Sequence, residues 1–240
     1  VALVAMRNPS VQDVYEPGST GKVMTLAAAL EEKKVTPETV ITVPYALKRS
    51  TKVFHDHEKH ATQYLTTAGV LAVSSNTGSI QIGELLSHDK FYDYLSKFGV
   101  GSKTGSGLPG ESRGILPKVA DWSGTSAPTM AFGQGYSLTA MQATSIFATI
   151  ANDGVRVSPT VIAGTRDSSG NFTPAPGRTS QRVISAETAQ TMRLMMESVV
   201  SGNGTAPSAA IAGYRVAGKT GTAQRIDDTC GCYRGYTASF

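Results

Sequence analysis

Three short polar strings along the chain carry side chains that could together perform acyl transfer. They are Ser19-Thr20-Gly21-Lys22, Ser74-Ser75-Asn76 and Lys219-Thr220-Gly221-Thr222, in that order. Serine is a poor nucleophile at neutral pH and needs a base within hydrogen-bond distance. Because residues three apart on a helix share a face, the amine of Lys22 could take the proton of the Ser19 hydroxyl.

The other polar side chains of these strings could complete such a reaction. Lys22 can act as a base only if its pKa falls well below about 10.4, through burial and a neighbouring cation. Lys219 could be that cation, and its ammonium could also bind a carboxylate of the substrate. Ser74 could relay a proton between Lys22 and a leaving amine, and Asn76 could hold a substrate amide and orient Lys22.

Backbone N–H groups could stabilise the negative charge on the carbonyl oxygen under attack. We assign this oxyanion hole to the N–H groups of Ser19, at a helix start, and Thr222, on an edge strand. Asn76 and the strand residues Thr220, Gly221 and Thr222 are predicted to bind substrate. The predicted chemistry is acylation of Ser19, loss of an amine, and attack on the acyl-enzyme by a second nucleophile.

Helix and strand patterns predict the elements that position these groups. Residues 22–32 combine strong helix formers with apolar side chains at helical spacing, so Ser19 is expected at or near a helix N-cap. A helix is predicted at 139–153, closed by Gly154, and another at 185–200 with Ser185 as its N-cap. Further predicted elements are helices at 67–73, 80–86 and 91–98, strands at 40–43 and 214–220, a hairpin or edge strand at 161–177 and a closing hairpin through Asp227 and Asp228.

Length and composition are those of an ordinary globular domain. The 240 residues, 40% hydrophobic and 17% charged, can bury a sizeable core, and we expect one domain over residues 1–240. The net charge of +4 is not gathered into a basic arm, which argues against nucleic-acid binding. No apolar run reaches the roughly 18 residues that a membrane-spanning helix needs. Because residues 1–6 and 236–240 each look like part of a strand, we expect a fragment of a longer protein.

A histidine-rich segment offers a competing metal-site interpretation. His55, His57 and His60 stand beside Asp56 and Glu58, and such a set could bind a divalent cation. No H-E-x-x-H pattern is present, and the flanking sequence favours irregular backbone. We therefore expect a polar loop that shapes the entrance of the cleft, with no metal and no cofactor in the protein.

Two further patterns have ordinary explanations. A second Lys-Thr-Gly string, Lys103-Thr104-Gly105, lies in a Gly- and Pro-rich loop and not on a strand, so we interpret it as coincidental. Cys230 and Cys232 are too few to form a structural zinc site. They could be reduced or bridged through a turn at Gly231, and they do not decide the redox compartment.

The order S-x-x-K, S-x-N, K-T-G resembles the signature of penicillin-binding proteins and serine β-lactamases. Within that superfamily the chain is most similar to class B penicillin-binding proteins, the monofunctional peptidoglycan transpeptidases. The sequence around Ser19 and the sequence of the loop at His55 resemble those of the cell-division enzyme of actinobacteria. The strings that carry the resemblance are residues 16–22, 74–78, 98–99 with 108–111, 132–135 and 216–223.

The resemblance implies an α+β fold of the α/β-sandwich type. It would contain a mainly antiparallel five-stranded sheet flanked by helices, and an all-helical lobe would form the other wall of the cleft. Residues are then expected to be missing near Met6 and Arg7, together with a membrane anchor, a pedestal and the closing strand and helix after Phe240.

The resemblance also implies a substrate and a cellular setting. The substrate would be the D-alanyl-D-alanine end of a peptidoglycan stem peptide, cross-linked with release of D-alanine, and β-lactams would acylate Ser19 as mimics. The protein would work at the extracytoplasmic face of the cell membrane. A septal glycosyltransferase and other divisome proteins would bind it through regions outside this chain.

Three other activities share the same strings. One is a D,D-carboxypeptidase of the same fold, and another is a non-catalytic β-lactam sensor that a flanking signalling segment would distinguish. The third is a β-lactamase, which in class A deacylates with a glutamate-activated water. The candidates Glu84, Glu111, Glu187 and Glu197 all stand outside an E-x-x-L-N motif, so hydrolysis of the acyl-enzyme should be slow.

Overall fold

The computed structural model describes residues 7–175, 177–227 and 232–239, with side chains described as far as residue 222. Its helices are α2 (Pro9–Gln12), η1 (Gly18–Gly21), α3 (Lys22–Glu31), α4 (Thr67–Ala72), α5 (Asn76–Gly83), α6 (His88–Lys97), η2 (Val119–Asp121), α7 (Ser126–Ala131), α8 (Ala140–Ala151), α9 (Ala186–Val200) and η3 (Pro207–Ala209). Its strands are β1 (Val40–Val43), β2 (Ala46–Arg49), β3 (Lys52–His55), β4 (Gln63–Thr66), β5 (Val155–Val157), β6 (Gly164–Arg166), β7 (Phe172–Pro174), β8 (Ser180–Arg182), β9 (Gly221–Asp227) and β10 (Cys232–Ser239).

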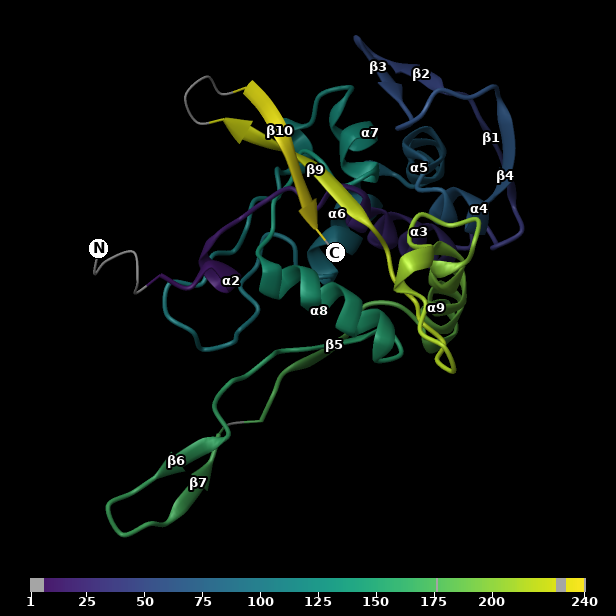
Figure 1. Ribbon diagram of the computed structural model, residues 1–240. Helices are drawn as coiled ribbons and strands as arrows, with labels where there is room; N and C mark the ends of the chain where they lie inside the picture. The colour runs from purple at the N-terminus through teal and green to yellow at the C-terminus, as the bar shows by residue number, and fades with distance from the viewer. Residues whose placement is uncertain (1–6, 176, 228–231, 240) are drawn as a thin grey trace.

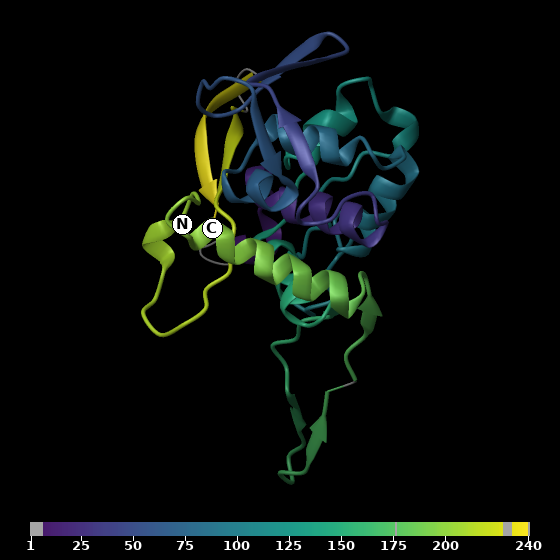
Figure 2. The same cartoon turned by 90° about the vertical axis from the view of Figure 1, so that its right-hand side faces the viewer.

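Helix α3 lies in the core and is enclosed by other helices. Eight of its ten residues are buried, so it presents no solvent face over most of its length. Helices α4, α5, α6 and α9 contact it, and Figure 2 shows α9 running across the body of the domain. A helix that is apolar all round is expected at the centre of a domain. The consequence for function is that Lys22, at the first position of α3, is removed from water.

A polar contact fixes α9 against the end of α3. The Glu31 carboxylate of α3 accepts hydrogen bonds from the backbone N–H of Ser185 at 3.0 Å and from its hydroxyl at 2.8 Å. The same hydroxyl caps α9 by accepting from the N–H of Thr188 at 3.1 Å. The predicted N-cap at Ser185 is therefore confirmed, and it also joins two helices of the core.

The described strands pair two by two, and every pair is antiparallel. The pairs are β1–β4, β2–β3, β5–β8, β6–β7 and β9–β10. The fold is therefore mixed α and β, as predicted, but the described residues do not form one five-stranded sheet. The β9–β10 pair crosses the body of the domain in Figure 1, and β9 lies against η1. This contact brings the third polar string to the 3-10 turn that carries Ser19.

A two-stranded arm projects from the helical body. It consists of β5 with β8 and, farther out, β6 with β7, and it extends well beyond the rest of the domain in both views (Figures 1 and 2). The Asp167 carboxylate closes its tip by accepting hydrogen bonds from the N–H groups of Ser169 and Asn171, each at 2.9 Å. The hairpin predicted within residues 161–177 is confirmed.

Three predicted element boundaries are wrong, for local reasons. The helix expected from Phe91 begins at His88, because the Ser87 hydroxyl accepts from the N–H of Lys90 at 3.3 Å and caps it. The helix expected from Ile80 begins at Asn76, because the Ser75 hydroxyl accepts from the N–H of Gly78 at 2.9 Å and caps it. Residues 214–220 form no strand, since the N–H of Gly218 donates to Met196 O of α9 at 3.3 Å and strand pairing starts only at Gly221.

Some predictions fall on parts of the chain that the structure does not describe. The strand expected at residues 1–6 and Cys230 lie outside the described residues, as does the side chain of Cys232. Within the described ranges, no helix combines the length and the apolar character required to span a membrane.

Candidate active site

The amine of Lys22 lies at the centre of a cluster formed by the first two polar strings. Its Nζ donates to Ser19 Oγ at 2.9 Å and to Asn76 Oδ1 at 2.7 Å. It also contacts both oxygens of Ser74, the carbonyl at 2.5 Å and Oγ at 3.1 Å. The side chain is fully buried at 0% exposure, so these groups take the place of water around the amine. The contact between Ser19 and Lys22 follows from their spacing of three residues.

Lys219 brings the third string into the same cluster. Its Nζ donates to Ser74 Oγ at 2.8 Å, to Thr220 O at 2.9 Å and to Thr220 Oγ1 at 3.2 Å. Lys219 is only 5% exposed. Ser74 Oγ therefore lies between the two amines and connects Ser19 to Lys219 through Lys22.

Burial and charge repulsion change the pKa values of both amines. Burial lowers the pKa of Lys22 well below its ordinary value, the positive charge of Lys219 lowers it further, and the carboxylate of Asp56 acts in the opposite direction. Burial lowers the pKa of Lys219 to about 7. An amine in such a site loses its proton far more readily than a lysine in water. Lys22 can therefore be a neutral amine with a lone pair facing Ser19 Oγ.

Ser19 lies in a tight turn two residues before Gly21, the N-cap of α3, which confirms the expected position near a helix N-cap. Residues Gly18–Gly21 form the 3-10 turn η1, which leads directly into α3. Gly18 has a φ of +55°, a conformation that favours glycine. Its N–H donates to Gly133 O at 2.9 Å, and a Cβ on Gly133 would lie 1.8 Å from Gly18 O. The segment at Gly133 thus packs directly against the serine turn.

The turn that carries Ser74 has an unusual backbone conformation. Ser74 has a φ of +61°, in the left-handed region that non-glycine residues rarely adopt. This conformation directs both its carbonyl and its hydroxyl oxygen to the Lys22 amine. Such backbone strain persists only where surrounding contacts hold it in place.

Asp56 supplies several of those contacts, and our sequence reasoning did not single it out. Its Oδ1 accepts from the N–H groups of Asn76 at 2.5 Å and Thr77 at 2.9 Å, and its Oδ2 accepts from Ser75 Oγ at 2.7 Å. Only the position of Asp56 within the histidine-rich segment could have drawn attention to it. Nothing in the spacing of 19 to 21 residues to these partners predicts the contacts.

Three of the predicted substrate-binding residues, Thr220, Gly221 and Thr222, lie at the start of β9 or just before it. Gly221 is buried, whereas Thr222 is exposed. The Thr220 hydroxyl lies 2.8 Å from the hydroxyl of Thr205 and faces Lys219. Because β9 lies against η1, the N–H groups of Ser19 and Thr222 belong to adjacent elements.

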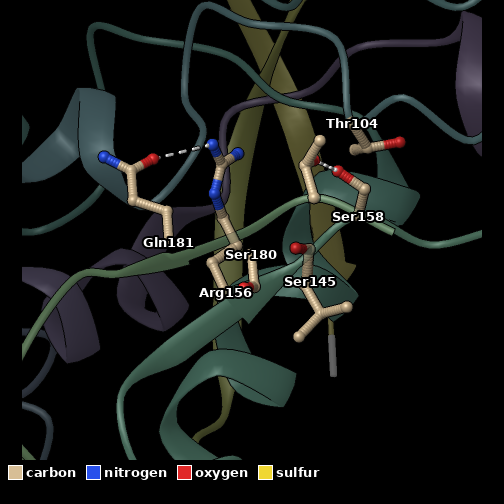
Figure 3. A pocket seen from close by; sticks show the side chains of 8 residues that line it. Thr104, Ser145, Arg156, Ser158, Ser180 and Gln181 are labelled. Atoms are coloured by element: carbon tan, nitrogen blue, oxygen red, sulfur yellow. Dashed lines mark hydrogen bonds between the residues drawn. The ribbon is translucent and has the colours of Figure 1, made fainter. Parts of the chain in front are cut away.

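The second Lys-Thr-Gly string is not part of this cluster. Lys103 is exposed, whereas the hydroxyl and N–H of Thr104 donate to the Glu111 carboxylate. Thr104 lines a separate cavity of about 340 Å³, shown in Figure 3, which contains none of the predicted site residues. The walls of this cavity are Thr104, Ser145, Arg156, Val157, Ser158, Thr179, Ser180 and Gln181.

The histidine-rich segment holds no metal-binding group among the described residues. No set of three or more His, Cys, Asp or Glu side chains is arranged there to bind an ion. Instead, Asp56 faces the S-x-N turn, and His60 Nε2 lies 3.1 Å from Asp56 Oδ2. His57 is exposed in the loop after β3. His55 is also exposed, but it ends β3, so the run expected to be irregular is the β2–β3 hairpin instead.

Comparison with known families places this cluster in context. The family model described as penicillin binding protein transpeptidase domain matches residues 2–240. The chain belongs to this family. It is 44% identical to the penicillin-binding protein PbpB of Mycolicibacterium smegmatis over 95% of its length, and 37% identical to the peptidoglycan D,D-transpeptidase FtsI of Escherichia coli over 92%. The resemblance to class B penicillin-binding proteins of the division type is confirmed.

Solved structures agree with this family assignment. Penicillin-binding protein 3 of Mycobacterium tuberculosis, complexed with aztreonam, is 42% identical with a TM-score of 0.92, and covers 95% of this chain and 52% of its own. The same protein complexed with ampicillin matches equally well. The chain spans about a third of the length of the curated relatives, since it covers 36% of both PbpB of M. smegmatis and FtsI of E. coli.

Proposed function

We propose that this chain is the catalytic domain of a peptidoglycan D,D-transpeptidase that works through an acyl-enzyme at Ser19. The observation that carries the proposal is the continuous set of hydrogen bonds from Ser19 Oγ through Lys22 Nζ and Ser74 Oγ to Lys219 Nζ. It joins a nucleophile, a buried base, a proton relay and a cation. The family match, and the names of relatives such as FtsI, support this reaction over others.

Acylation would use the first two strings. Neutral Lys22 accepts the proton of Ser19 Oγ as that oxygen attacks the carbonyl of the penultimate D-alanine. The C–N bond then breaks, and the leaving amine takes a proton from the Ser74 hydroxyl, which recovers one from Lys22. The products are an ester on Ser19, free D-alanine and a neutral Lys22.

Deacylation would run the same proton path in reverse. The amine of an acceptor stem peptide attacks the ester carbonyl, and its proton passes to Ser74 and Lys22. Ser19 Oγ leaves with a proton from Lys22, and a new amide joins the two peptides. Because an amine replaces an amine, the reaction needs no external energy source.

The remaining predicted residues would hold the substrate. Lys219, at the base of β9, would bind the terminal carboxylate, and Asn76 would bind a substrate amide while orienting Lys22. Thr220, Gly221 and Thr222 would align the peptide along β9. The N–H groups of Ser19 and Thr222 would form the oxyanion hole, a role that the contact between η1 and β9 supports.

We also propose the five-stranded sheet and the location at the membrane that the family resemblance implies. The antiparallel β9–β10 pair beside η1 would be part of a five-stranded sheet, with the helices around α3 forming the helical lobe. The whole protein would act at the extracytoplasmic face of the membrane, with a septal glycosyltransferase and other divisome proteins as partners. Names such as FtsI and PbpB among the relatives support this setting.

Intact-mass spectrometry after incubation with benzylpenicillin tests the proposal. We expect a single covalent adduct that peptide mapping assigns to Ser19, because β-lactams mimic the D-alanyl-D-alanine end. The Ser19→Ala variant should form no adduct and should keep its unfolding temperature. An adduct of equal yield on that variant, or no adduct on the wild type, contradicts the proposal.

The lifetime of the adduct and the product formed distinguish the related activities. We expect the adduct to persist, because three of the candidate glutamates are engaged elsewhere: Glu84 with Arg49, Glu111 with Thr104 and Glu197 with Arg215. Rapid loss of the adduct with released penicilloic acid indicates a β-lactamase. With a stem pentapeptide and an amine acceptor, a transpeptidase forms the cross-linked amide, whereas a carboxypeptidase only releases D-alanine.

A further inference from the structure

Asp56 makes four close polar contacts beside the S-x-N turn, outside the residues assigned to the reaction. Its side chain is only 9% exposed and follows β3 in the chain. One carboxylate oxygen accepts the first two N–H groups of α5, from Asn76 and Thr77. The other faces Ser75 Oγ and the ring of His60. A carboxylate at this position pairs N–H groups that have no partner within the helix.

These contacts determine where Asn76 lies. The Asp56 carboxylate accepts from the backbone N–H of Asn76. The backbone carbonyl of His55 accepts from Asn76 Nδ2 at 2.9 Å. The amide oxygen of Asn76 is then directed to the Lys22 amine at 2.7 Å. The loop after β3 therefore holds Asn76 by its main chain and its side chain, and Asn76 in turn holds Lys22.

His60 restrains the Asp56 carboxylate from the other side. Its Nδ1 lies 2.7 Å from Ala61 O, and its Nε2 lies 3.1 Å from Asp56 Oδ2. Both partners are acceptors, and only the doubly protonated ring can donate to both. Hydrogen bonds to Ala61 and Asp56 accordingly raise the pKa of His60. The ring also contacts Tyr45, with ring centroids 5.9 Å apart, which limits its rotation.

We propose that Asp56 and His60 form a positioning pair for the acyl-transfer site, in which Asp56 fixes Asn76 against Lys22 and His60 holds the Asp56 carboxylate in place. This inference rests on the proposed function. It gives the histidine-rich segment a role in the reaction without direct contact to the reacting atoms.

The pair has an electrostatic consequence that a purely structural role would not have. Asp56 raises the pKa of Lys22, whereas burial and the charge of Lys219 lower it more strongly. His60 contacts the Asp56 carboxylate and acts on Lys22 through it. Removing the carboxylate charge should lower the pKa of Lys22. The acid limb of the acylation profile, which requires neutral Lys22, then moves to lower pH. The loss of positioning should separately lower the maximum rate.

The test compares benzylpenicillin acylation rates between pH 5 and 10 in the wild type, Asp56→Asn, Asp56→Glu and His60→Gln. For Asp56→Asn we expect at least a tenfold lower maximum and an acid limb displaced to lower pH. Asp56→Glu keeps the charge on a longer side chain, so its maximum should fall without that displacement. His60→Gln should lower the maximum by a smaller factor. His57→Gln, an exposed neighbour in the same loop, is the matched control and should match the wild type.

The pKa of Lys22, followed by NMR on ¹³C-labelled lysine side chains, gives a readout that does not depend on the reaction. Its decrease in Asp56→Asn is expected whether or not the protein is acylated. A wild-type rate and an unmoved Lys22 pKa in Asp56→Asn would overturn the positioning pair while leaving the transpeptidase proposal intact. Failure of the wild type to be acylated, with the Lys22 pKa still displaced in Asp56→Asn, would instead contradict the transpeptidase proposal and leave the Asp56–Lys22 relation standing.

Discussion

The amines of Lys22 and Lys219 donate to the same oxygen, Ser74 Oγ, at 3.1 and 2.8 Å. A hydroxyl has two lone pairs and one proton, so it can accept from both amines while its own proton points toward a bound substrate. Two ammonium ions so close together in a buried site would repel strongly. The arrangement therefore favours one neutral amine, and burial together with the charge of Lys219 lowers the pKa of Lys22 well below its ordinary value.

Ser74→Gly should remove the relay while keeping the turn. Glycine accepts the φ of +61° without strain, and the backbone carbonyl that contacts Lys22 remains. Relief of strain and the extra flexibility of the unfolded chain are of similar size and opposite sign, but two buried amines each lose the Oγ acceptor, so the free energy of unfolding should fall by about 1–3 kcal/mol. Acylation by benzylpenicillin should slow by about a hundredfold or more, because a proton-transfer group is lost.

The matched control for that variant is Lys33→Gly. Lys33 also has a positive φ, of +53°, but it is exposed at the end of α3 and away from Ser74. Its substitution should change the free energy of unfolding by less than about 1 kcal/mol and leave the acylation rate unchanged. Equal acylation rates in Ser74→Gly and wild type would remove Ser74 from the proton path.

Lys22→Arg should abolish acylation even though the positive charge is kept. A guanidinium does not lose its proton in proteins, so it cannot accept the proton of Ser19. We expect the acylation rate to fall by about 10²- to 10⁴-fold at every pH, measured by fluorescent penicillin labelling. A variant that recovers the wild-type rate at high pH would show that another group is the base.

Folding stability should rise with pH because the pKa values of both buried amines are lowered, and Lys219 sets part of that rise. Its pKa is about 7 in the folded protein against 10.5 for the ordinary side chain. Between these values the unfolded chain binds a proton that the folded protein does not, so the free energy of unfolding increases with pH. One such proton contributes up to about 1.4 kcal/mol per pH unit. Below pH 7 Lys219 is protonated in both states and its share of the slope disappears, whereas Lys22 makes a contribution of its own with the same sign.

Lys219→Met isolates this contribution because it removes the titrating amine and keeps an unbranched side chain. Urea unfolding at pH 7.5 and 9.5 should show a smaller gain in stability for the variant than for the wild type. Lys103→Met, at the exposed lysine of the second Lys-Thr-Gly string, should keep the wild-type gain. Acylation by benzylpenicillin should weaken in Lys219→Met alone, since the carboxylate of the antibiotic loses its partner.

Local patterns in the sequence predict a large part of the fold. The capping residues Thr139 and Ser185 fix the starts of α8 and α9, and both helices begin where the pattern indicated. The contact of Ser19 with Lys22 is equally local, since it depends only on a spacing of three residues. The 3-10 geometry at Ser19 was not predicted, because it depends on the close approach of Gly133, more than a hundred residues away.

Contacts between distant segments account for the rest. No periodicity connects Lys22 to Ser74 or Lys219, and only the family resemblance suggested that these strings meet. Asp56 was missed for the same reason, since a carboxylate in a polar loop gives no sign of the backbone N–H groups that it faces. The start of β9 was misplaced because it depends on pairing between Gly221 and Ser239.

Gly21→Ala should destabilise the domain through the packing behind Ser19. An added Cβ would lie 2.2 Å from Tyr136 Oη and 2.7 Å from Gly133 Cα, and the second of these is backbone that cannot move aside alone. Overpacking of this kind costs about 1–3 kcal/mol, which urea unfolding can measure. The same displacement would move Ser19, so the acylation rate should fall as well. Gly202→Ala is the control, because an added Cβ there meets no atom within 4 Å. Equal stability of the two variants would mean that the serine turn can shift freely against Gly133, and the preorganisation of Ser19 would then need another source.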